Sequence, residues 1–293
     1  MSHTHPVENR PVTIGLIGGR GKMGLMFKAM FESDGCKVLV AGRKEAPDYT
    51  ELVEASDVII TTVPIDKTTS LMENLAPNMR PEQLLSDFTS IKAEPLRAML
   101  KSPSSVIGCH PLFGPMPTAE GQNVVLCPER PGPWLGWYRD FFERHGMRVS
   151  EMTPAAHDEA MAFIQGLTHF INIVFARTLQ TREADLKQIL EICSPVYQLF
   201  FSIMCRILSG DSELYGQIQI SNPNNPPVLG EFLKNAEGLL ETIKEKDAEG
   251  VYRIFDEAAE NLGDFKQIAR DESNFLITQL TRYLREKNNP DKS

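Results

Sequence analysis

Apolar and polar positions follow two different periods along this chain of 293 residues. In the first half, short β-rich apolar runs are separated by stretches in which apolar residues recur with the helical period. The runs predict strands at 12–17, 37–41, 58–63, 84–85, 106–107 and 124–126, and the stretches between them include helices at 22–33, 91–100 and 134–144. Strands that alternate with helices indicate an α/β domain, in which a parallel sheet carries helices on both faces.

The second half is dominated by helical periods. Helices are predicted at 155–181, 194–209, 228–245 and 248–285. We therefore expect a polar tail at 1–11, an α/β domain at 12–152 and an all-α domain at 153–293. Several of these helices are apolar on most sides and need more partners than one small domain offers. The chain is thus expected to form a homodimer through the helical domain.

Composition narrows the class of partner and the compartment. A net charge of −9 argues against a nucleic-acid or anionic-membrane partner, because both require a positive face. The five cysteines include no C-x-x-C pair and lie in apolar surroundings, so we expect buried reduced thiols and no metal site. The polar start is no secretory signal, and no apolar run is expected to span a bilayer. These features predict a cytoplasmic protein.

A glycine-rich segment follows the first predicted strand and opens the first predicted helix. It reads Gly19-Arg20-Gly21-Lys22-Met23-Gly24, and all six residues are expected to line a cofactor. Gly19 permits the tight turn, Gly21 lets the backbone approach a pyrophosphate, and Gly24 lets the helix pack closely on the strand. The helix N-terminus then faces the anion. Because strand and helix supply the required context, we expect a Rossmann-like dinucleotide site.

The end of the second predicted strand distinguishes the two nicotinamide cofactors. An acidic residue there would bind the ribose 2′-hydroxyl of NAD, but this chain has Ala41-Gly42-Arg43-Lys44. Arg43 and Lys44 suit a 2′-phosphate, and Arg20 offers a further cation from the glycine loop. We therefore favour NADP. The alternative is NAD, with Arg43 and Lys44 as solvated surface charges.

His110 is the candidate proton acceptor. Pro111 restricts its backbone to extended conformations, and the pKa of an unperturbed imidazole lies near neutrality. We expect this histidine on a stiff loop that follows a strand. Farther along, an apolar helix carries Gln165, His169 and Asn172 at i, i+4 and i+7, which places them in one polar line. This line favours a chemical role for His110 over a purely structural one.

Arg206 is the only charge in the apolar part of the helix predicted at 194–209. A guanidinium in a buried stretch needs an anionic partner, because its desolvation is otherwise too costly. Glu159 and Asp211 are possible internal partners. A substrate carboxylate is favoured, since arginine binds carboxylates through two parallel hydrogen bonds.

Several ordered segments extend this pattern across both halves of the chain. They are Gly18–Gly24, Asp87-Phe88-Thr89-Ser90-Ile91-Lys92, Gly108-Cys109-His110-Pro111-Leu112-Phe113-Gly114-Pro115, Phe163-Ile164-Gln165-Gly166-Leu167-Thr168-His169-Phe170 and Ser194-Pro195-Val196-Tyr197. On these segments the chain resembles the prephenate and arogenate dehydrogenase family of tyrosine biosynthesis. The resemblance implies a Rossmann-like N-terminal domain, an intertwined helical dimerisation domain and a nicotinamide-dependent oxidoreductase. The 11 residues before the first strand are too few for the chorismate mutase bundle of fused relatives, so we expect the monofunctional form.

The resemblance also implies a reaction, the oxidative decarboxylation of prephenate to 4-hydroxyphenylpyruvate. A hydride passes from ring C4 to the nicotinamide, the ring carboxylate leaves as CO2, and the ring becomes aromatic. By resemblance, His110 accepts the proton of the C4 hydroxyl, Ser90 orients its imidazole and Arg206 holds a substrate carboxylate. The other expected contacts are His169, Lys92 and Gln165 around the substrate and Thr62, Val63 and Pro64 beneath the cofactor.

Three alternatives to this function stay open. Arogenate or 4-amino-4-deoxyprephenate dehydrogenases share most of these motifs, and the stretch after Arg206 departs from the common family pattern. A non-catalytic NADP-binding regulator is less favoured, because it would not need His110, Ser90 and Arg206 together. A β-hydroxy acid dehydrogenase is disfavoured, since its acid–base lysine has no counterpart between Met152 and Arg182.

Overall fold

The chain forms two compact units in the computed structural model, which describes residues 7, 10–42, 49–115 and 118–288. The first unit is Met1–Gly166 with Gly216–Asn224, and the second is Leu167–Tyr215 with Asn225–Ser293. The boundary predicted at residue 152 follows the change in composition, whereas the compact units divide after Gly166. The difference arises because helix α6 (Pro154–Met161) is bonded to the α/β part. The Asp158 carboxylate on α6 accepts hydrogen bonds from the backbone N–H groups of Lys92 and Ala93.

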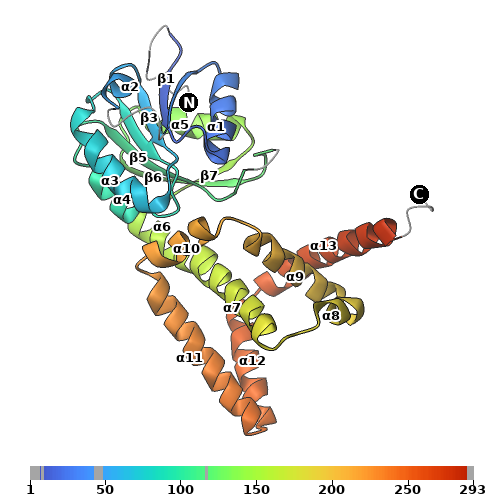
Figure 1. Ribbon diagram of the computed structural model, residues 1–293. Coiled ribbons are helices and arrows are strands. Elements are labelled where there is room, and N and C mark those ends of the chain that lie inside the picture. Colours follow the sequence, from blue (N-terminus) through green and yellow to red (C-terminus); the bar gives the residue numbers. More distant parts are fainter. Residues whose placement is uncertain (1–6, 8–9, 43–48, 116–117, 289–293) are drawn as a thin grey trace. The chain divides into compact units, whose positions relative to one another are not determined.

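A sheet forms the centre of the first unit (Figure 1). Its seven strands follow the order β2-β1-β3-β4-β5-β6-β7. Strands β1 to β5 are parallel, as predicted, but β6 runs antiparallel to β5. Residues 112–122 join these two strands, and that segment is too short for the helical crossover that parallel strands require. The strands are β1 (Thr13–Ile17), β2 (Lys37–Ala41), β3 (Val58–Thr61), β4 (Leu84–Asp87), β5 (Ser105–Pro111), β6 (Asn123–Arg130) and β7 (Arg148–Glu151).

Helices cover both faces of this sheet. The helical elements of this unit are α1 (Lys22–Ser33), α2 (Thr50–Glu54), α3 (Ile65–Leu75), a 3-10 turn (Ala76–Asn78), α4 (Ala93–Met99), α5 (Trp134–Arg144), α6 and a π-helical turn (Ala162–Leu167). Buried side chains of α1 and α5 pack on one face, and those of α2, α3 and α4 pack on the other. The result is the three-layer α/β/α arrangement that the sequence predicts.

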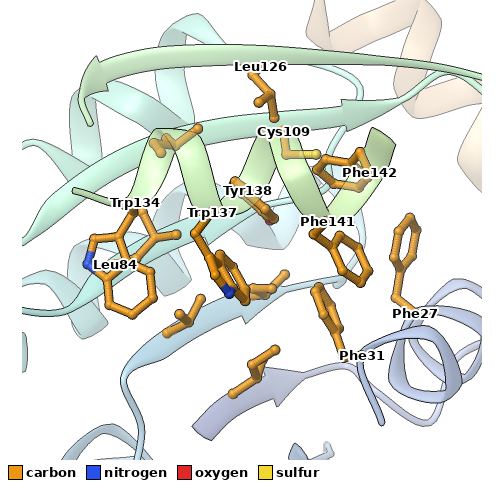
Figure 2. Close-up of a cluster of buried hydrophobic side chains, with 14 of the residues drawn as sticks. Phe27, Phe31, Leu84, Cys109, Leu126, Trp134, Trp137, Tyr138, Phe141 and Phe142 are labelled. Carbon is orange, nitrogen blue, oxygen red and sulfur yellow. The ribbon is translucent and has the colours of Figure 1, made fainter. Parts of the chain in front are cut away.

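Aromatic side chains fill the layer beneath α1 and α5. Figure 2 shows Phe27 and Phe31 of α1 facing the aromatic rings of α5. The rings of Phe31 and Phe141 stack with their centroids 4.2 Å apart, and Trp134 meets Trp137 edge-on at 5.6 Å. Large aromatic surfaces buried in this way stabilise the packing of the sheet against these two helices.

The second unit is helical in its described residues. Its helices are α7 (Thr168–Thr181), α8 (Leu186–Ile192), α9 (Pro195–Leu208), α11 (Asn225–Lys244), α12 (Ala248–Leu262) and α13 (Phe265–Asn288), and α10 (Ser212–Ser221) extends from this unit into the first. The single helix predicted at 248–285 is two helices, because Gly263 adopts a φ of +51° that ends α12. The fold class predicted from the sequence is confirmed.

Two smaller expectations need correction. Residues Pro154–Thr181 form a helical segment that is long and apolar enough, by length and composition, to cross a membrane. The sequence alone predicts no such run. One segment of this kind is weak support for a membrane span, since core helices of soluble proteins have the same character. All five cysteines are free thiols, but only Cys109 and Cys127 are buried.

Candidate active site

The glycine loop between β1 and α1 has the geometry of an anion cradle. Gly18, rather than Gly19, takes the left-handed conformation of the tight turn, with a φ of +82°. A Cβ on Gly24 would lie 2.5 Å from the Gly19 Cα, so the first turn of α1 packs directly against the loop. Gly21 is the exposed N-cap residue, and no side chain caps the helix there. The N-terminus of α1 therefore presents backbone N–H groups to a pyrophosphate.

The neighbouring strands place this loop at a ligand-binding edge of the sheet. β1 pairs with β2 on one side and with β3 on the other, so the strand order reverses at β1. In open α/β sheets, ligands bind at the carboxyl ends of the strands at such a point. Thr62 follows β3 there, and a Cβ on Gly18 would meet its carbonyl oxygen at 2.8 Å. Val63 and Pro64 continue from Thr62 into α3, so the structure brings this predicted segment beside the glycine loop.

The described residues of the glycine loop and of β2 fit a dinucleotide. The residues that would distinguish NADP from NAD are not among them. The Gly18 N–H donates to the Ala41 carbonyl at 3.0 Å, which joins the loop to the end of β2. The segment Lys37–Gly42 carries no acidic residue that would bind a ribose 2′-hydroxyl. Arg43 and Lys44, on which the preference for NADP rests, fall outside the described residues.

His110 lies within a strand rather than on the loop that the sequence predicts. It is the sixth residue of β5 and is 3% exposed. Strand β4 pairs with β5 only as far as Gly108, so the last three residues of β5 are paired through β6. Ladder pairing with Val125 therefore holds the backbone of His110, and neighbouring side chains set the direction of its ring.

Both ring nitrogens of His110 have polar neighbours from the segment that follows β7. His110 Nδ1 lies 2.9 Å from His157 Nε2, and His157 Nδ1 lies 2.8 Å from Asp158 Oδ1. Gln165 Nε2, in the π-helical turn, lies 3.3 Å from His110 Nε2. This turn interrupts the α-helical spacing on which the predicted line of Gln165, His169 and Asn172 depended. The structure thus joins Gln165 to His110 and adds two residues, His157 and Asp158.

The burial of these imidazoles changes their titration. Burial lowers the pKa of His110 well below its usual value, and the neighbouring His157 and Lys92 act in the same direction. Burial also lowers the pKa of His157, although its hydrogen bond to Asp158 opposes this. Both rings are therefore neutral near pH 7, and a neutral His110 is able to accept a proton.

The structure places Lys92 and Ser90 differently from the roles expected for them. The Lys92 side chain has no exposed area, and its Nζ forms an ion pair with Asp87 at the end of β4. Gly108 makes room for it, because a Cβ there would lie 2.9 Å from Lys92 Cδ. Lys92 is therefore a buried structural cation here. Ser90 is half-buried between β4 and α4, and its hydroxyl forms no hydrogen bond to His110 in the part of the chain that the structure describes.

The predicted residues of the second unit have different surroundings. Arg206 is exposed on α9, so the premise that its guanidinium is buried is wrong for this single chain. Within the described residues of its own unit, Arg206 has no ion pair, and Asp211 is not its partner. His169 is half-buried edge-on against Tyr215 with ring centroids 4.8 Å apart, and burial lowers its pKa. Asn172 is buried and donates to the Thr168 carbonyl at 2.7 Å.

His157 and Asp158 are site residues that the sequence did not predict. A signal for them exists, because Asp158, Gln165 and Asn172 are spaced seven residues apart in a strongly apolar segment. This spacing extends the predicted polar line by two helical turns toward the N-terminus. Apart from the adjacent His157, these partners of Asp158 lie more than sixty residues away: the backbone N–H of Lys92 donates to its carboxylate, and Asn222 donates to its carbonyl. Such long-range partners leave no local pattern.

The geometry defines a class of protein, a Rossmann-type nucleotide-binding protein with a buried imidazole at the ends of the sheet strands. Comparison with known families agrees with this class. The family model described as "Prephenate dehydrogenase, nucleotide-binding domain" matches residues 33–151, and the model described as "Prephenate dehydrogenase, dimerization domain" matches residues 153–257. The chain therefore belongs to the prephenate dehydrogenase family, whose members are NAD(P)-dependent oxidoreductases.

Individual relatives support the same family. The chain is 34% identical over 278 residues to a protein of Methanocaldococcus jannaschii named "Probable arogenate/prephenate dehydrogenase". The alignment covers 88% of this chain and 62% of the relative. The chain is also 29% identical over 272 residues to the T-protein of Enterobacter agglomerans, in an alignment that covers 92% of this chain and 72% of that protein. The chain thus spans less than two thirds of the first relative's length.

A solved structure shows the same fold. The prephenate dehydrogenase from A. aeolicus, in complex with hydroxyphenyl propionate and NAD+, superposes with a TM-score of 0.68 at 18% identity. The superposition covers 87% of this chain and 98% of the other. At this identity the likeness concerns the fold.

Proposed function

We propose that this protein catalyses the NAD(P)-dependent oxidative decarboxylation of prephenate to 4-hydroxyphenylpyruvate. The observation that carries the proposal is the buried His110 at the carboxyl end of the sheet, whose pKa is lowered by burial, in a chain of the prephenate dehydrogenase family. Arogenate and 4-amino-4-deoxyprephenate are the alternative substrates. They differ from prephenate in the side chain or in the group on ring C4, while hydride leaves C4 in all three.

His110 is proposed to act as the proton acceptor. Its Nε2 accepts the hydrogen of the C4 hydroxyl as hydride leaves C4, and the oxygen of the phenol product regains that proton after CO2 departs. The reaction therefore releases no net proton and needs only a well-placed, neutral imidazole. Gln165 is proposed to yield its long 3.3 Å contact with this nitrogen to the substrate hydroxyl.

The glycine loop is proposed to hold the cofactor through its pyrophosphate. The N-terminus of α1 has no acidic residue in its first turn and carries Lys22 there, so it favours an anion. When bound, the nicotinamide supplies the hydride acceptor. We propose NADP as the preferred cofactor on the strength of Arg43 and Lys44 in the sequence, with NAD as the alternative.

A substrate panel tests the proposal directly. Prephenate, arogenate and 4-amino-4-deoxyprephenate are each supplied with NADP and with NAD, and reduced cofactor is followed by its absorbance. Turnover of prephenate with a higher kcat/KM for NADP is the expected result. A higher kcat/KM for one of the other two substrates would reassign the substrate, and absence of turnover with all six combinations would remove the proposal.

Arg206 is proposed to bind a carboxylate of the substrate. The substitution Arg206→Gln removes the charge and keeps a shorter polar side chain. We expect KM for prephenate to rise by about tenfold or more, since a charge-assisted hydrogen bond contributes roughly 1.5–3 kcal/mol, with a smaller change in kcat. Steady-state kinetics at saturating cofactor measure both constants. An unchanged KM would remove Arg206 from the substrate site.

The second unit is proposed to form a homodimer. Large apolar side chains are exposed on its helices, and among them Phe255 is 72% and Phe265 is 75% exposed in the single chain. Many exposed large apolar side chains on the helices of one unit favour a protein interface. Sedimentation equilibrium is expected to give twice the chain mass of 32.8 kDa. A monomer at every accessible concentration would contradict this proposal.

A further inference from the structure

We propose that His157 and Asp158 are positioning residues that hold His110 in the tautomer with its lone pair on Nε2. This inference rests on the proposed function of His110 as proton acceptor. It concerns the three side chains His110, His157 and Asp158, which lie in series within the first unit. We call this series the His–His–Asp chain.

The direction of each hydrogen bond follows from the Asp158 carboxylate, which ends the His–His–Asp chain. An ionised carboxylate only accepts hydrogen bonds. Asp158 Oδ2 accepts from the Ala93 N–H at 2.9 Å, and Oδ1 accepts from the Lys92 N–H at 2.8 Å. The contact of Oδ1 with His157 Nδ1 at 2.8 Å therefore requires the hydrogen to be on Nδ1 of His157. Because this ring is neutral, its Nε2 carries a lone pair.

The same argument passes to the next ring. His157 Nε2 can only accept, so His110 Nδ1, 2.9 Å away, must donate its hydrogen. A neutral His110 with hydrogen on Nδ1 has its lone pair on Nε2. The amide nitrogen of Gln165 at 3.3 Å from this Nε2 is consistent with a donor there. The three contacts thus agree on one proton arrangement in which the reactive nitrogen is the free base.

Burial makes the arrangement specific. His157 has no exposed area and Asp158 is 2% exposed, so water does not replace either partner. Two backbone N–H groups at the start of α4 anchor the carboxylate, and Asn222 fixes the Asp158 backbone by donating to its carbonyl at 2.7 Å. Backbone groups rather than mobile side chains therefore orient the Asp158 carboxylate. When His110 takes a proton on Nε2, its Nδ1–H remains bonded to an acceptor that stabilises the cation.

His157 favours one tautomer of His110 because it accepts the hydrogen on Nδ1. If Nδ1 of His110 had no acceptor, its hydrogen would be left buried and unpaired, which disfavours that tautomer. Gln165 can rotate its amide and offer its oxygen to a hydrogen on Nε2 instead. The reactive nitrogen would then be blocked. His157 is thus expected to affect kcat through the protonation pattern of His110, without contacting the substrate.

Nitrogen-15 NMR of the histidine rings tests the inference on the free protein. The chain has six histidines, so selective labelling gives a simple spectrum, and His110→Asn assigns the His110 signals. A long-range proton–nitrogen correlation at about pH 8, where histidines are neutral, shows which ring nitrogen of His110 carries hydrogen. We expect hydrogen on Nδ1 in the parent protein. Hydrogen on Nε2 would overturn the inference whatever the substrate proves to be.

Two variants of His157 separate positioning from packing. His157→Leu removes the acceptor and is expected to move the His110 hydrogen to Nε2 and lower kcat by about 10²-fold, the lower end of what a placed base contributes. His157→Gln can accept at its amide oxygen, so we expect hydrogen on Nδ1 and recovery of most of the lost kcat. The matched control is His145→Gln at the C-cap of α5, which is expected to change neither property.

The outcomes are distinct from those of the substrate panel. Equal losses of kcat in His157→Leu and His157→Gln, with Nδ1–H retained in both, would overturn the inference and leave the proposed function intact. An unchanged kcat in His157→Leu would also overturn it. If His157→Leu does not fold, the parent spectrum and His157→Gln still decide. If the panel shows no turnover at all, the NMR result still decides the tautomer.

Discussion

Replacing His110 with asparagine is expected to lower kcat by about 10²- to 10⁴-fold, the contribution of a well-placed general base. His110→Asn keeps an N–H near the position of Nδ1, so it is able to donate to His157 Nε2. It has no atom at the position of Nε2 and cannot accept the hydrogen of the C4 hydroxyl. Steady-state kinetics with the best substrate and cofactor of the panel measure the loss.

The control for this prediction is cofactor binding. His110 lies on β5, whereas the glycine loop follows β1, so the Kd for the oxidised cofactor is expected to stay near that of the parent. Ladder bonds to β6 are made by the backbone and remain in the variant. A variant that binds cofactor normally and turns over at the parental rate would show that His110 is not the proton acceptor. Loss of both properties would indicate misfolding, which the circular dichroism spectrum detects.

Replacing Lys92 with methionine is expected to lower the free energy of unfolding by about 3–5 kcal/mol, the usual cost of removing one partner of a buried ion pair. Lys92 and Asp87 both have no exposed area. Lys92→Met keeps most of the side-chain volume but leaves the Asp87 carboxylate with only the Thr89 N–H and hydroxyl as partners. Asp87 Oδ1 already has no hydrogen-bond partner among the described residues, so the remaining charge is poorly compensated. Urea unfolding measures the change.

Two further variants make this prediction sharp. Lys92→Met combined with Asp87→Asn removes both charges and is expected to be more stable than Lys92→Met alone, because no uncompensated ion remains buried. Lys101→Met breaks the exposed pair with Glu73 and is expected to cost less than about 1 kcal/mol. Normal stability with a raised KM in Lys92→Met would restore the substrate-binding role that the family resemblance implies.

Local sequence patterns were sufficient for most of the fold. Apolar runs bounded by glycine and proline predicted the parallel strands, because a buried strand must be apolar on both faces. The glycine loop was predicted from three glycines between a strand and a helix, and the structure moves the positive φ by one residue, to Gly18. The reversed strand β6 was missed, since an apolar run specifies burial but carries no direction.

His110 shows both the strength and the limit of sequence reasoning about the site. Its residue type and the following proline identified it as a candidate, because imidazole chemistry belongs to the residue itself. Its position inside β5, its burial and its lowered pKa depend on the strands and helices around it. The same applies to Lys92, which the family resemblance implied to lie around the substrate and which the structure pairs with Asp87.

The chain's own order of residues determined the two-part architecture, the nucleotide-binding loop and the identity of the candidate base, because each of these depends on neighbours within a few residues. Folding in three dimensions determined the protonation pattern of that base. His157 and Asp158 lie 47 and 48 positions beyond His110, and Asp158 is held by backbone groups 65 and 66 positions before it. Hydrogen bonds act over about 3 Å whatever the sequence separation, so only the packed structure shows that these groups meet.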